Sequence, residues 1–531
     1  MKTKKFLSLF LSTIIFFSIF TVGTTQVFAA NIDSKNKNIH STGIHYSDEV
    51  GNIYWDYDDK TSILTIKKKN PNSKNIKMPN YSEGSQAPWL ELVDKVAETQ
   101  AINIEEGITS IGDYCFNGLN NLRTINAPDV TYIGKYAFSG CNSLSSLDLG
   151  SKNTTIGVGA FSNCSELLEA KGTGKVKIYS YAFAACDKLR TFYFPQATLL
   201  GSYCFEKNEL LKTIKVPNAT INRFCFSDSS INNITVGSLE DYALYENTTI
   251  KTINISNAKK IGDYALSGCN QVTGDLKAPN VTTVGKYAFE NTKFASISLS
   301  KVKMIDDYAF TKCNTLTKGY FGNSLIKIGK GAFLNCQNLS SSLSLKNVKI
   351  IDSYAFANCK NIGCNSLGNK LVKLGSCSFA GCSKIKSLYV PSVAKNIGSN
   401  ISSNVTKVGK EDVSVDNNTE RIKIYTPKNS PIYKKYISNK HNKKLLRNAV
   451  TSIKISKTNL TLKKGKSYKF KVTVNPSYAS HKNWTISTTN KNVVSVSGSG
   501  TIKGINKGTC YVSFTSRDGS NKVAKCKVRV C

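Results

Sequence analysis

The sequence predicts a mainly β protein in which a solenoid of about thirteen coils, each of about 22 residues, precedes a small β-sandwich. Two observations predict this fold class. A motif ending in Tyr, a tiny residue and Phe recurs through most of the chain at nearly constant spacing. Residues 449–531 instead alternate short apolar runs with Asn, Gly and Ser, a pattern typical of the strands and turns of a sandwich.

The recurring motif begins with an aliphatic residue that Gly often follows, as in Ile111–Phe116, Ile133–Phe138 and Ile351–Phe356. Its last position, the anchor, is spaced 21 to 23 residues from the next, except for 18 residues between Phe226 and Leu244. Self-similarity at such a period indicates coils stacked on a shared interior. The anchors are Phe116, Phe138, Phe161, Phe183, Phe205, Phe226, Leu244, Leu266, Phe289, Phe310, Phe333, Phe356 and Phe379.

A short strand follows each anchor, as in Leu122–Pro128 and Leu211–Pro217, with aliphatic residues predicted inward and polar ones outward. Parallel strands stack ~4.8 Å apart, so thirteen coils would form a rod or arc of roughly 60 Å. The residue before the anchor is Ala in nine copies, Cys in three and Ser in one. Only tiny side chains occur there, as a tightly packed interior requires.

The sixteen cysteines would ordinarily suggest a disulfide framework in an exported protein. Eight of them instead lie three residues after an anchor, at 141, 164, 186, 269, 313, 336, 359 and 382. The other five copies hold Leu119, Asn208, Ser229, Asn247 and Thr292 there. Four of these five are small polar residues that can bond to a turn backbone, so we interpret the ladder as buried free thiols with the same task. Cys510 and Cys526 are expected in the core of the sandwich, and Cys531 as an exposed thiol able to dimerise the protein.

The N-terminus has the pattern of a secretory signal peptide over residues 1–29. A lysine cluster precedes an apolar run from Phe6 to Phe20 and the small-residue site Val27–Ala29. The alternative is an uncleaved membrane anchor, for which the apolar run is short. We therefore expect a secreted protein without a transmembrane segment when mature, extracellular or held non-covalently at the cell wall.

The net charge of +36 is concentrated at the C-terminal end. Residues 449–531 hold 16 Lys and Arg against one acid, Asp518, and residues 421–448 add nine without any acid. These segments carry +24, which leaves +9 for residues 30–420. A basic end on a nearly balanced body implies an anionic partner for that end.

The motif Ile-Gly-x-Tyr-Ala-Phe-x-x-Cys-x-x-Leu, with its strand ending in Pro, resembles the BspA-like, Treponema-type leucine-rich repeat over residues 100–395. Trp55–Tyr57, Ile63–Ile66, Tyr81 and Ala87–Trp89 resemble that family's β-rich N-terminal cap, placed at 30–99. Residues 396–448 are assigned to a closing cap with one short helix, Pro431–Ile437, and a basic linker. Residues 449–531 resemble a bacterial immunoglobulin-like domain of the invasin/intimin group, from Val450–Ser456, Val474–Pro476 and Trp484.

The resemblance implies a secreted or surface protein used in adhesion, with extracellular-matrix or host-surface glycoproteins as partners. It fixes no binding residues. From the strand pattern itself, one outward position per coil would form the concave face of a sheet. Tyrosine there offers apolar area and a polar tip, so Tyr193, Tyr320 and Tyr389, with Lys171, Lys215 and Lys277, are candidate ligand contacts. The alternative is that these residues merely solvate the sheet. The thirteen positions are Asn126, Asp148, Lys171, Tyr193, Lys215, Thr235, Asn254, Lys277, Ser298, Tyr320, Ser344, Ser366 and Tyr389.

The basic end is a candidate site for anionic wall polymers such as teichoic acids, or for sulfated glycans; the alternative is a surface that only maintains solubility. Nucleic acid is not expected, because no readout element is recognised. A second possible function is a structural wall or biofilm-matrix protein that binds only polyanions. The candidate residues are Lys434, Lys435, Lys443, Lys444, Lys463, Lys464, Lys466, Lys469 and Lys471.

The sequence predicts neither catalysis nor a cofactor or metal. It contains no recognised nucleophile elbow, zinc-binding helix motif or phosphate-binding glycine loop. The four histidines lie outside the repeats. Asp113, Asp263, Asp306 and Asp307 fall within the repeat motif and are interpreted as turn residues, and stacked coils offer an open surface rather than a pocket.

Overall fold

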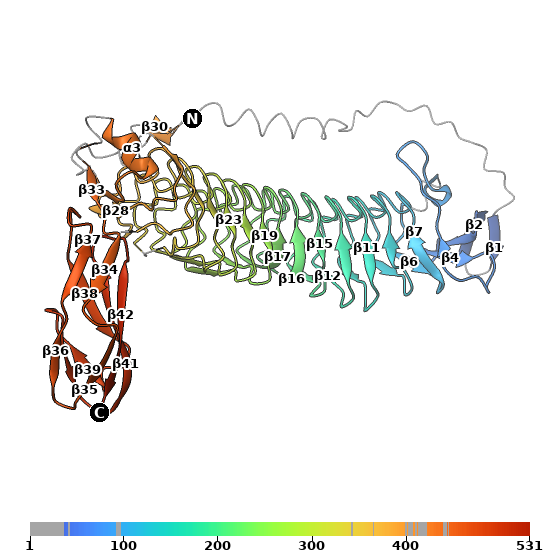
Figure 1. Ribbon diagram of the computed structural model, residues 1–531. Coiled ribbons are helices and arrows are strands. Elements are labelled where there is room, and N and C mark those ends of the chain that lie inside the picture. Colours follow the sequence, from blue (N-terminus) through green and yellow to red (C-terminus); the bar gives the residue numbers. More distant parts are fainter. Residues whose placement is uncertain are drawn as a thin grey trace.

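The computed structural model describes residues 37–40, 43–91, 97–340, 343–364, 366–398, 401, 407–408, 411–412, 422–438, 443 and 445–531. These residues form a solenoid with a β-rich cap at its start and a sandwich projecting from its end (Figure 1). The predicted signal peptide lies outside the described residues. Among the described residues, the helices with given bounds are the 3-10 turn η2 (Pro88–Glu91) and α3 (Pro431–Ile437), and no helix there is long and apolar enough to cross a membrane.

The N-terminal cap is an antiparallel sheet whose last strand becomes the first rung of the solenoid. Strands β1 (Lys37–His40), β2 (Gly43–Val50), β3 (Ile53–Asp58) and β4 (Ile63–Lys68) pair antiparallel, and β4 then pairs parallel with β6 (Ala101–Ile104). Trp89 is fully buried, stacks on Phe116 at 5.7 Å, and its indole N–H donates to the carbonyl of Cys115 at 2.8 Å. This tryptophan covers the end of the interior, as the resemblance implied.

Each coil contributes to two parallel sheets. The long sheet contains fifteen strands in unbroken order, with one more strand pairing off that path. Its strands are β5 (Ile76–Lys77), β7 (Ile108–Ile111), β9 (Tyr132–Ile133), β11 (Thr154–Ile156), β13 (Val176–Ile178), β15 (Leu199–Leu200), β16 (Thr213–Ile221), β17 (Asn233–Leu239), β19 (Lys260–Ile261), β21 (Thr283–Val284), β23 (Met304–Ile305), β25 (Lys327–Ile328), β26 (Ile350–Ile351), β27 (Lys373–Leu374) and β29 (Asn396–Ile397).

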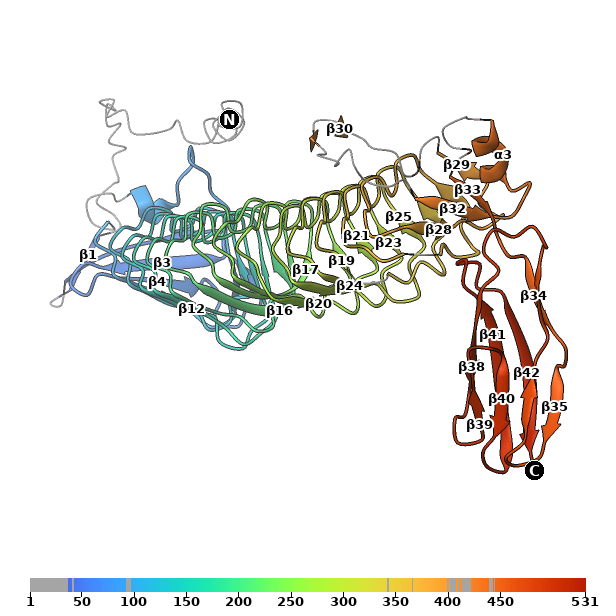
Figure 2. The same cartoon turned by 90° about the vertical axis from the view of Figure 1, so that its left-hand side faces the viewer.

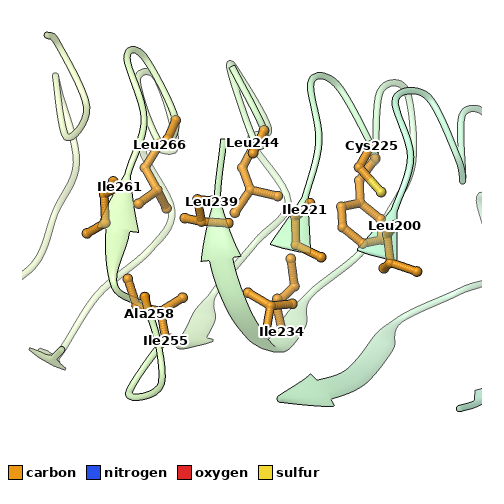
Figure 3. Close-up of a cluster of buried hydrophobic side chains, with 14 of the residues drawn as sticks. Leu200, Ile221, Cys225, Ile234, Leu239, Leu244, Ile255, Ala258, Ile261 and Leu266 are labelled. Carbon is orange, nitrogen blue, oxygen red and sulfur yellow. The ribbon is translucent and has the colours of Figure 1, made fainter. Parts of the chain in front are cut away.

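The second set, here the short-strand sheet, holds the strands predicted after each anchor. It is interrupted into shorter groups: β8 (Thr124–Asn126), β10 (Ser146–Asp148), β12 (Glu169–Lys171), β14 (Thr191–Tyr193), β18 (Thr252–Asn254), β20 (Asp275–Lys277), β22 (Ser296–Ser298), β24 (Lys318–Tyr320) and β28 (Ser387–Tyr389). At the 18-residue copy, β16 and β17 are long enough to take part in both sheets. Leu200, Ile221, Leu239 and Ile261 point into the interior there (Figure 3).

The anchors form one continuous buried column. All thirteen are at most 2% exposed, and neighbouring rings lie 4.9 to 5.8 Å apart, stacked nearly parallel, wherever two phenylalanines follow one another. The tiny residue before each anchor is fully buried in every copy. The predicted shared interior is confirmed.

The cysteine ladder also has the predicted role. All sixteen cysteines lie within the described residues, and none forms a disulfide. Each ladder thiol donates to the anchor carbonyl of the preceding coil at 2.9 to 3.3 Å, for example Cys336 Sγ to Phe310 O. Asn208 and Asn247 donate to the same carbonyl through Nδ2, whereas Ser229 and Thr292 donate to the anchor carbonyl of their own coil.

The motif's Gly and Tyr serve the close stacking of turns. A Cβ on Gly134 would lie 2.5 Å from the backbone of Asp113 in the preceding coil. The tyrosines adopt a left-handed backbone, with φ of 50° to 61°, and stack along the flank, as Tyr242 and Tyr264 do at 4.8 Å. Where Gly159 replaces Tyr, the ring of Tyr136 occupies the space of the missing Cβ. The carboxylates of Asp113, Asp263 and Asp307 accept from the next coil's backbone, which confirms them as turn residues.

The array closes on β28, β32 (Lys423–Thr426) and β33 (Leu446–Asn448), and α3 contacts β33 and β29; β30 (Lys407–Val408) and β31 (Glu411–Asp412) pair separately. The Tyr436 hydroxyl accepts from Ile401 N at 3.0 Å. The sandwich follows as β34 (Ser452–Ile455), β35 (Asn459–Leu462), β36 (Ser467–Lys469), β37 (Val472–Asn475), β38 (Trp484–Thr488), β39 (Val494–Val496), β40 (Thr501–Gly504), β41 (Gly508–Ser516) and β42 (Val523–Val530). Cys510 and Cys526 are in its core, as predicted, and Cys531 is exposed.

Replacing Phe333 by Ala should lower the free energy of unfolding by about 3–5 kcal/mol, because the ring packs between Phe310 and Phe356 at 5.1 and 5.3 Å. Urea denaturation followed by circular dichroism measures this. The control is Tyr320→Ala, the loss of a 62% exposed ring, with an expected change within about 0.5 kcal/mol. Equal midpoints for the two variants would contradict the buried column.

Native alkylation with iodoacetamide at pH 8 should modify Cys531 and spare the ladder. Burial raises the pKa of Cys164 and of Cys269 to about 12, so both remain protonated thiols at this pH. After unfolding without reductant, sixteen modified cysteines are expected by mass spectrometry. A count well below sixteen would show that disulfides are present.

Candidate binding surfaces

The outward side of the short-strand sheet, here the short-strand face, carries the side chains predicted for ligand contact. Tyr193 and Tyr320 are 56% and 62% exposed. The register places Lys171 beside Tyr193 and Ser298 beside Tyr320 on neighbouring coils. Each strand holds one inward residue between two outward ones, so the tyrosines project away from the packed interior. These rings are therefore accessible to a partner.

A shallow groove lies on this face over the irregular coil. Its cavity volume is about 250 Å³, and Thr213–Lys215, Asn233–Thr235 and Thr252–Asn254 line it. Ile214 and Ile234 are buried beneath it, whereas the outward residues are hydroxyls, amides and the Lys215 ammonium. The Thr252 hydroxyl donates to Asn233 Oδ1 at 2.6 Å. The groove is thus a polar hydrogen-bonding surface with an apolar floor.

The three predicted lysines differ in their surroundings. Lys171 lies 3.2 Å from Glu169 and 3.7 Å from Asp148, and the hydrogen bond to Glu169 is the main cause that raises its pKa. This ammonium is already neutralised locally. Lys215 lines the groove, and Lys277 is exposed on β20. Lys215 and Lys277 are therefore better placed than Lys171 to meet an external ligand.

The prediction that Tyr389 is an accessible contact is wrong. Its side chain is 4% exposed, and burial raises its pKa, with the Asp518 carboxylate of the sandwich adding to this effect. Neighbouring contacts cross the same junction: Tyr425 packs edge-on against His481, and Asn521 Nδ2 donates to Ser366 Oγ at 3.4 Å. The last coils therefore meet the sandwich at this position, and Tyr389 is covered.

The sandwich presents unneutralised lysines. Lys463, Lys464, Lys466, Lys469 and Lys471 are all exposed, in the turn after β35, at the end of β36 and just before β37. The only acid of this segment, Asp518, is 4% exposed and accepts from Val450 N and from the backbone and hydroxyl of Ser520. Its charge is committed to the junction and the last hairpin, so it cannot neutralise the distant lysines.

A second basic row in the sandwich was missed at the sequence level. Lys525, Lys527 and Arg529 alternate with buried residues along β42 and face outward beside the exposed Tyr511. The alternation of Lys, Cys, Lys, Val, Arg and Val predicts this arrangement once the strand is recognised. Basic side chains therefore lie on both sheets of the sandwich.

The lysines before the sandwich are less uniform. Lys434 is exposed on α3, and Lys435 donates from Nζ to the carbonyl of Ile397, which holds the helix to the last coil. Lys443 is exposed, and Lys444 lies outside the described residues. Of these four candidate lysines, Lys434 and Lys443 are thus the two whose exposed side chains remain available to a polyanion.

These features define a capped parallel β-solenoid with a terminal sandwich. The repeats match the family profile of the BspA type leucine-rich repeat region in overlapping segments, 95–210, 173–250, 237–363 and 341–454. The chain therefore belongs to the BspA-type leucine-rich repeat family. Residues 449–528 match the bacterial Ig-like domain of group 2. Leucine-rich repeat proteins of this kind are typically not enzymes.

Solved structures of other bacterial proteins are similar at low identity. A leucine-rich repeat protein from Bacteroides ovatus is 21% identical, with 73% of this chain and 97% of that one covered and a TM-score of 0.42. A leucine-rich cell surface protein from Faecalibacterium prausnitzii is 18% identical, with 70% and 98% covered and a TM-score of 0.28. The pneumococcal vaccine antigen PcpA is 16% identical, with 78% and 96% covered and a TM-score of 0.28.

One curated relative matches over a short segment. Kappa-carrageenase from Pseudoalteromonas carrageenovora is 35% identical over 82 residues, which are 15% of this chain and 20% of that protein. The chain thus spans a fifth of the length of this relative.

Proposed function

We propose that the protein is a secreted or cell-surface binding protein of the adhesin type. Its short-strand face binds host or partner macromolecules, with matrix or surface glycoproteins as the expected class, and its basic C-terminal region attaches to anionic wall polymers or sulfated glycans. The observation that carries the proposal is the open short-strand face, with two exposed tyrosines and a polar groove.

The composition of the face suits a glycoprotein surface. Exposed tyrosine supplies apolar area and a hydrogen-bonding hydroxyl at small entropic cost. The groove adds hydroxyl and amide groups of the kind that pair with sugar hydroxyls or a peptide backbone. Lys171 is neutralised by its neighbours, which leaves the part of the face near Tyr193 without strong net charge. We expect recognition there to depend on shape and hydrogen bonds more than on ionic attraction.

Attachment has a different physical basis. The exposed lysines of the sandwich face no accessible acid within residues 449–531, so their field extends into solvent. Such charge attracts polyanions over a range of ~8 Å at physiological ionic strength. The protein thus combines a nearly neutral short-strand face with a basic C-terminal end. This uneven charge supports an adhesin function over that of a uniformly charged coat protein.

Replacing Tyr193 and Tyr320 together by Ala should weaken binding to the responsive ligand of a matrix-protein and glycan panel by at least about tenfold, since each exposed tyrosine ring contributes ~1 kcal/mol or more. Surface plasmon resonance with the full chain measures this. The matched control replaces Tyr132 and Tyr179, which are each 41% exposed beside the long sheet. Unchanged affinity in the first variant, or an equal loss in the control, would refute the proposed face.

Changing Lys463, Lys464, Lys466, Lys469 and Lys471 to Gln should lower the salt concentration that elutes the protein from heparin or from immobilised teichoic acid. The reason is the loss of five exposed charges, and stability should change little because the side chains are on the surface. Retention of the natural protein that withstands half-molar salt would contradict an electrostatic attachment.

A structural wall or matrix protein that binds only polyanions is the second candidate, and the charge of the sandwich favours it. The two variants above separate the functions. An adhesin loses its macromolecular ligand only with the tyrosine change, whereas the structural protein responds only to the lysine change.

A further inference from the structure

The solenoid itself has two electrostatically different halves. Residues 97–292 contain 17 Lys and Arg and 18 acids, for a net charge of −1. Residues 293–398 contain fifteen lysines, no arginine and three acids, for +12. A net charge taken over the whole array hides this contrast. The C-terminal coils are therefore a second basic region, in addition to the sandwich.

The charges on these coils follow a period of two coils. Lys327 in β25 lies 3.5 Å from Asp306, and Lys373 in β27 lies 2.8 Å from Asp352. The second pair thus lies 46 residues, or two coils, after the first in the chain. In Asp352 burial opposes ionisation, but the bonds from Lys373 and from Ser353 N outweigh it and lower the pKa of the carboxyl. Two of the three acids in residues 293–398 are therefore paired with lysines of the next coil.

Three of the remaining lysines form a row at the edge of the long-sheet strands. Lys303, Lys349 and Lys395 each come directly before a two-residue strand of the long sheet, and all are exposed. Ile326 and Val372 fill the same position in the intervening coils. Backbone bonds of 2.7 to 3.0 Å connect all five residues in sequence, from Ile326 N to Lys303 O and onward to Lys395 N. The row thus runs along the solenoid axis.

The row has a regular pitch and a mixed chemistry. Adjacent coils lie ~4.8 Å apart, so successive lysines of the row are about 10 Å apart. Between them Ile326 and Val372 are 40% and 43% exposed. Lys346 and Lys370 are exposed on the preceding turns. None of these five lysines forms an ion pair within the described coils, and the carboxylates of Asp306 and Asp352 are paired with Lys327 and Lys373.

We infer that this lysine row (Lys303, Lys349 and Lys395, with Lys346 and Lys370 beside it) binds a linear polyol-phosphate polymer laid along the solenoid axis. Lysine is a compact point charge that suits phosphate, whereas arginine, which suits planar bidentate groups, is absent from residues 293–398. The exposed aliphatic side chains contact the carbon backbone between phosphates. The row positions from Lys303 to Lys395 hold only Lys, Ile and Val. They offer no aromatic ring on which nucleic-acid bases could stack, so single-stranded nucleic acid fits less well.

The lysine row and the basic surface of the sandwich consist of different residues. The row also lies on a different sheet of the solenoid from the short-strand face. Strands β19, β21, β23 and β25 belong to the long sheet and β20 and β24 to a separate sheet, and Figure 2 shows the two groups as separate rows along the solenoid. A polymer on the row therefore leaves the short-strand face open.

The test compares two variants of the full chain for binding to poly(glycerol phosphate) by isothermal titration at several salt concentrations. Changing Lys303, Lys346, Lys349 and Lys395 to Gln should weaken binding by at least about tenfold. It should also flatten the plot of log K against log salt by about 0.7 for each lysine that contacts phosphate. The matched control changes Lys175, Lys177, Lys251 and Lys286, which are exposed on the N-terminal coils, and should retain the original affinity. Unchanged melting temperatures verify folding in both.

The outcomes separate this inference from the attachment through the sandwich. Unchanged binding in the row variant, or an equal loss in the control, would overturn the lysine row while leaving the sandwich untested by that result alone. Loss in the row variant without loss in the variant of Lys463, Lys464, Lys466, Lys469 and Lys471 would support the row and overturn the sandwich as the attachment. A larger loss toward single-stranded DNA or heparin than toward poly(glycerol phosphate) would reject the polyol phosphate as the partner.

Discussion

The structure depends on one constraint: every coil must return to the same buried column at the spacing of adjacent strands. A phenylalanine ring on each turn meets the ring of the next coil, and the residue before it must be tiny because the backbone of a neighbouring turn lies against it. Turn carbonyls enclosed by this stacking still require hydrogen-bond donors. The cysteine thiols and the Asn208 and Asn247 amides supply them from the next coil. The thiols thus have a role in backbone satisfaction that does not require oxidation.

The column explains why so much of the fold could be predicted from the sequence. Anchors, tiny residues and ladder positions all serve contacts between coils about 22 residues apart, so the periodicity of the sequence directly reports them. The capping tryptophan and the closing helix followed from the family resemblance. The breaks in the short-strand sheet and the extension of β16 and β17 across both sheets did not, because they depend on how coils of unequal length adjust to each other.

The binding surfaces were less predictable, because the accessibility of a surface side chain also depends on contacts that the repeat does not encode. Tyr193 and Tyr320 are exposed because their contacts are local, whereas Tyr389 is covered by residues from a different module. The position of a residue in a repeat predicts whether its side chain points inward or outward. It does not predict whether another module covers that side chain at the end of the array. The lysine row could not be predicted from the repeat, because its period is two coils rather than one. Its recognition also requires the ion pairs that neutralise Asp306 and Asp352.

The distribution of charge follows from what a solenoid can offer. A stack of coils has no deep pocket, so specificity must come from rows of side chains repeated at the pitch of the strands. In alternate coils the row position holds Ile326 or Val372 and the lysine that follows is paired with an acid, so the exposed lysines of the row have twice the coil spacing. The short-strand face instead keeps its ammonium groups few or paired, as at Lys171. We propose that the scaffold uses its two sheets to separate a surface for a linear polyanion from a surface for a neutral partner.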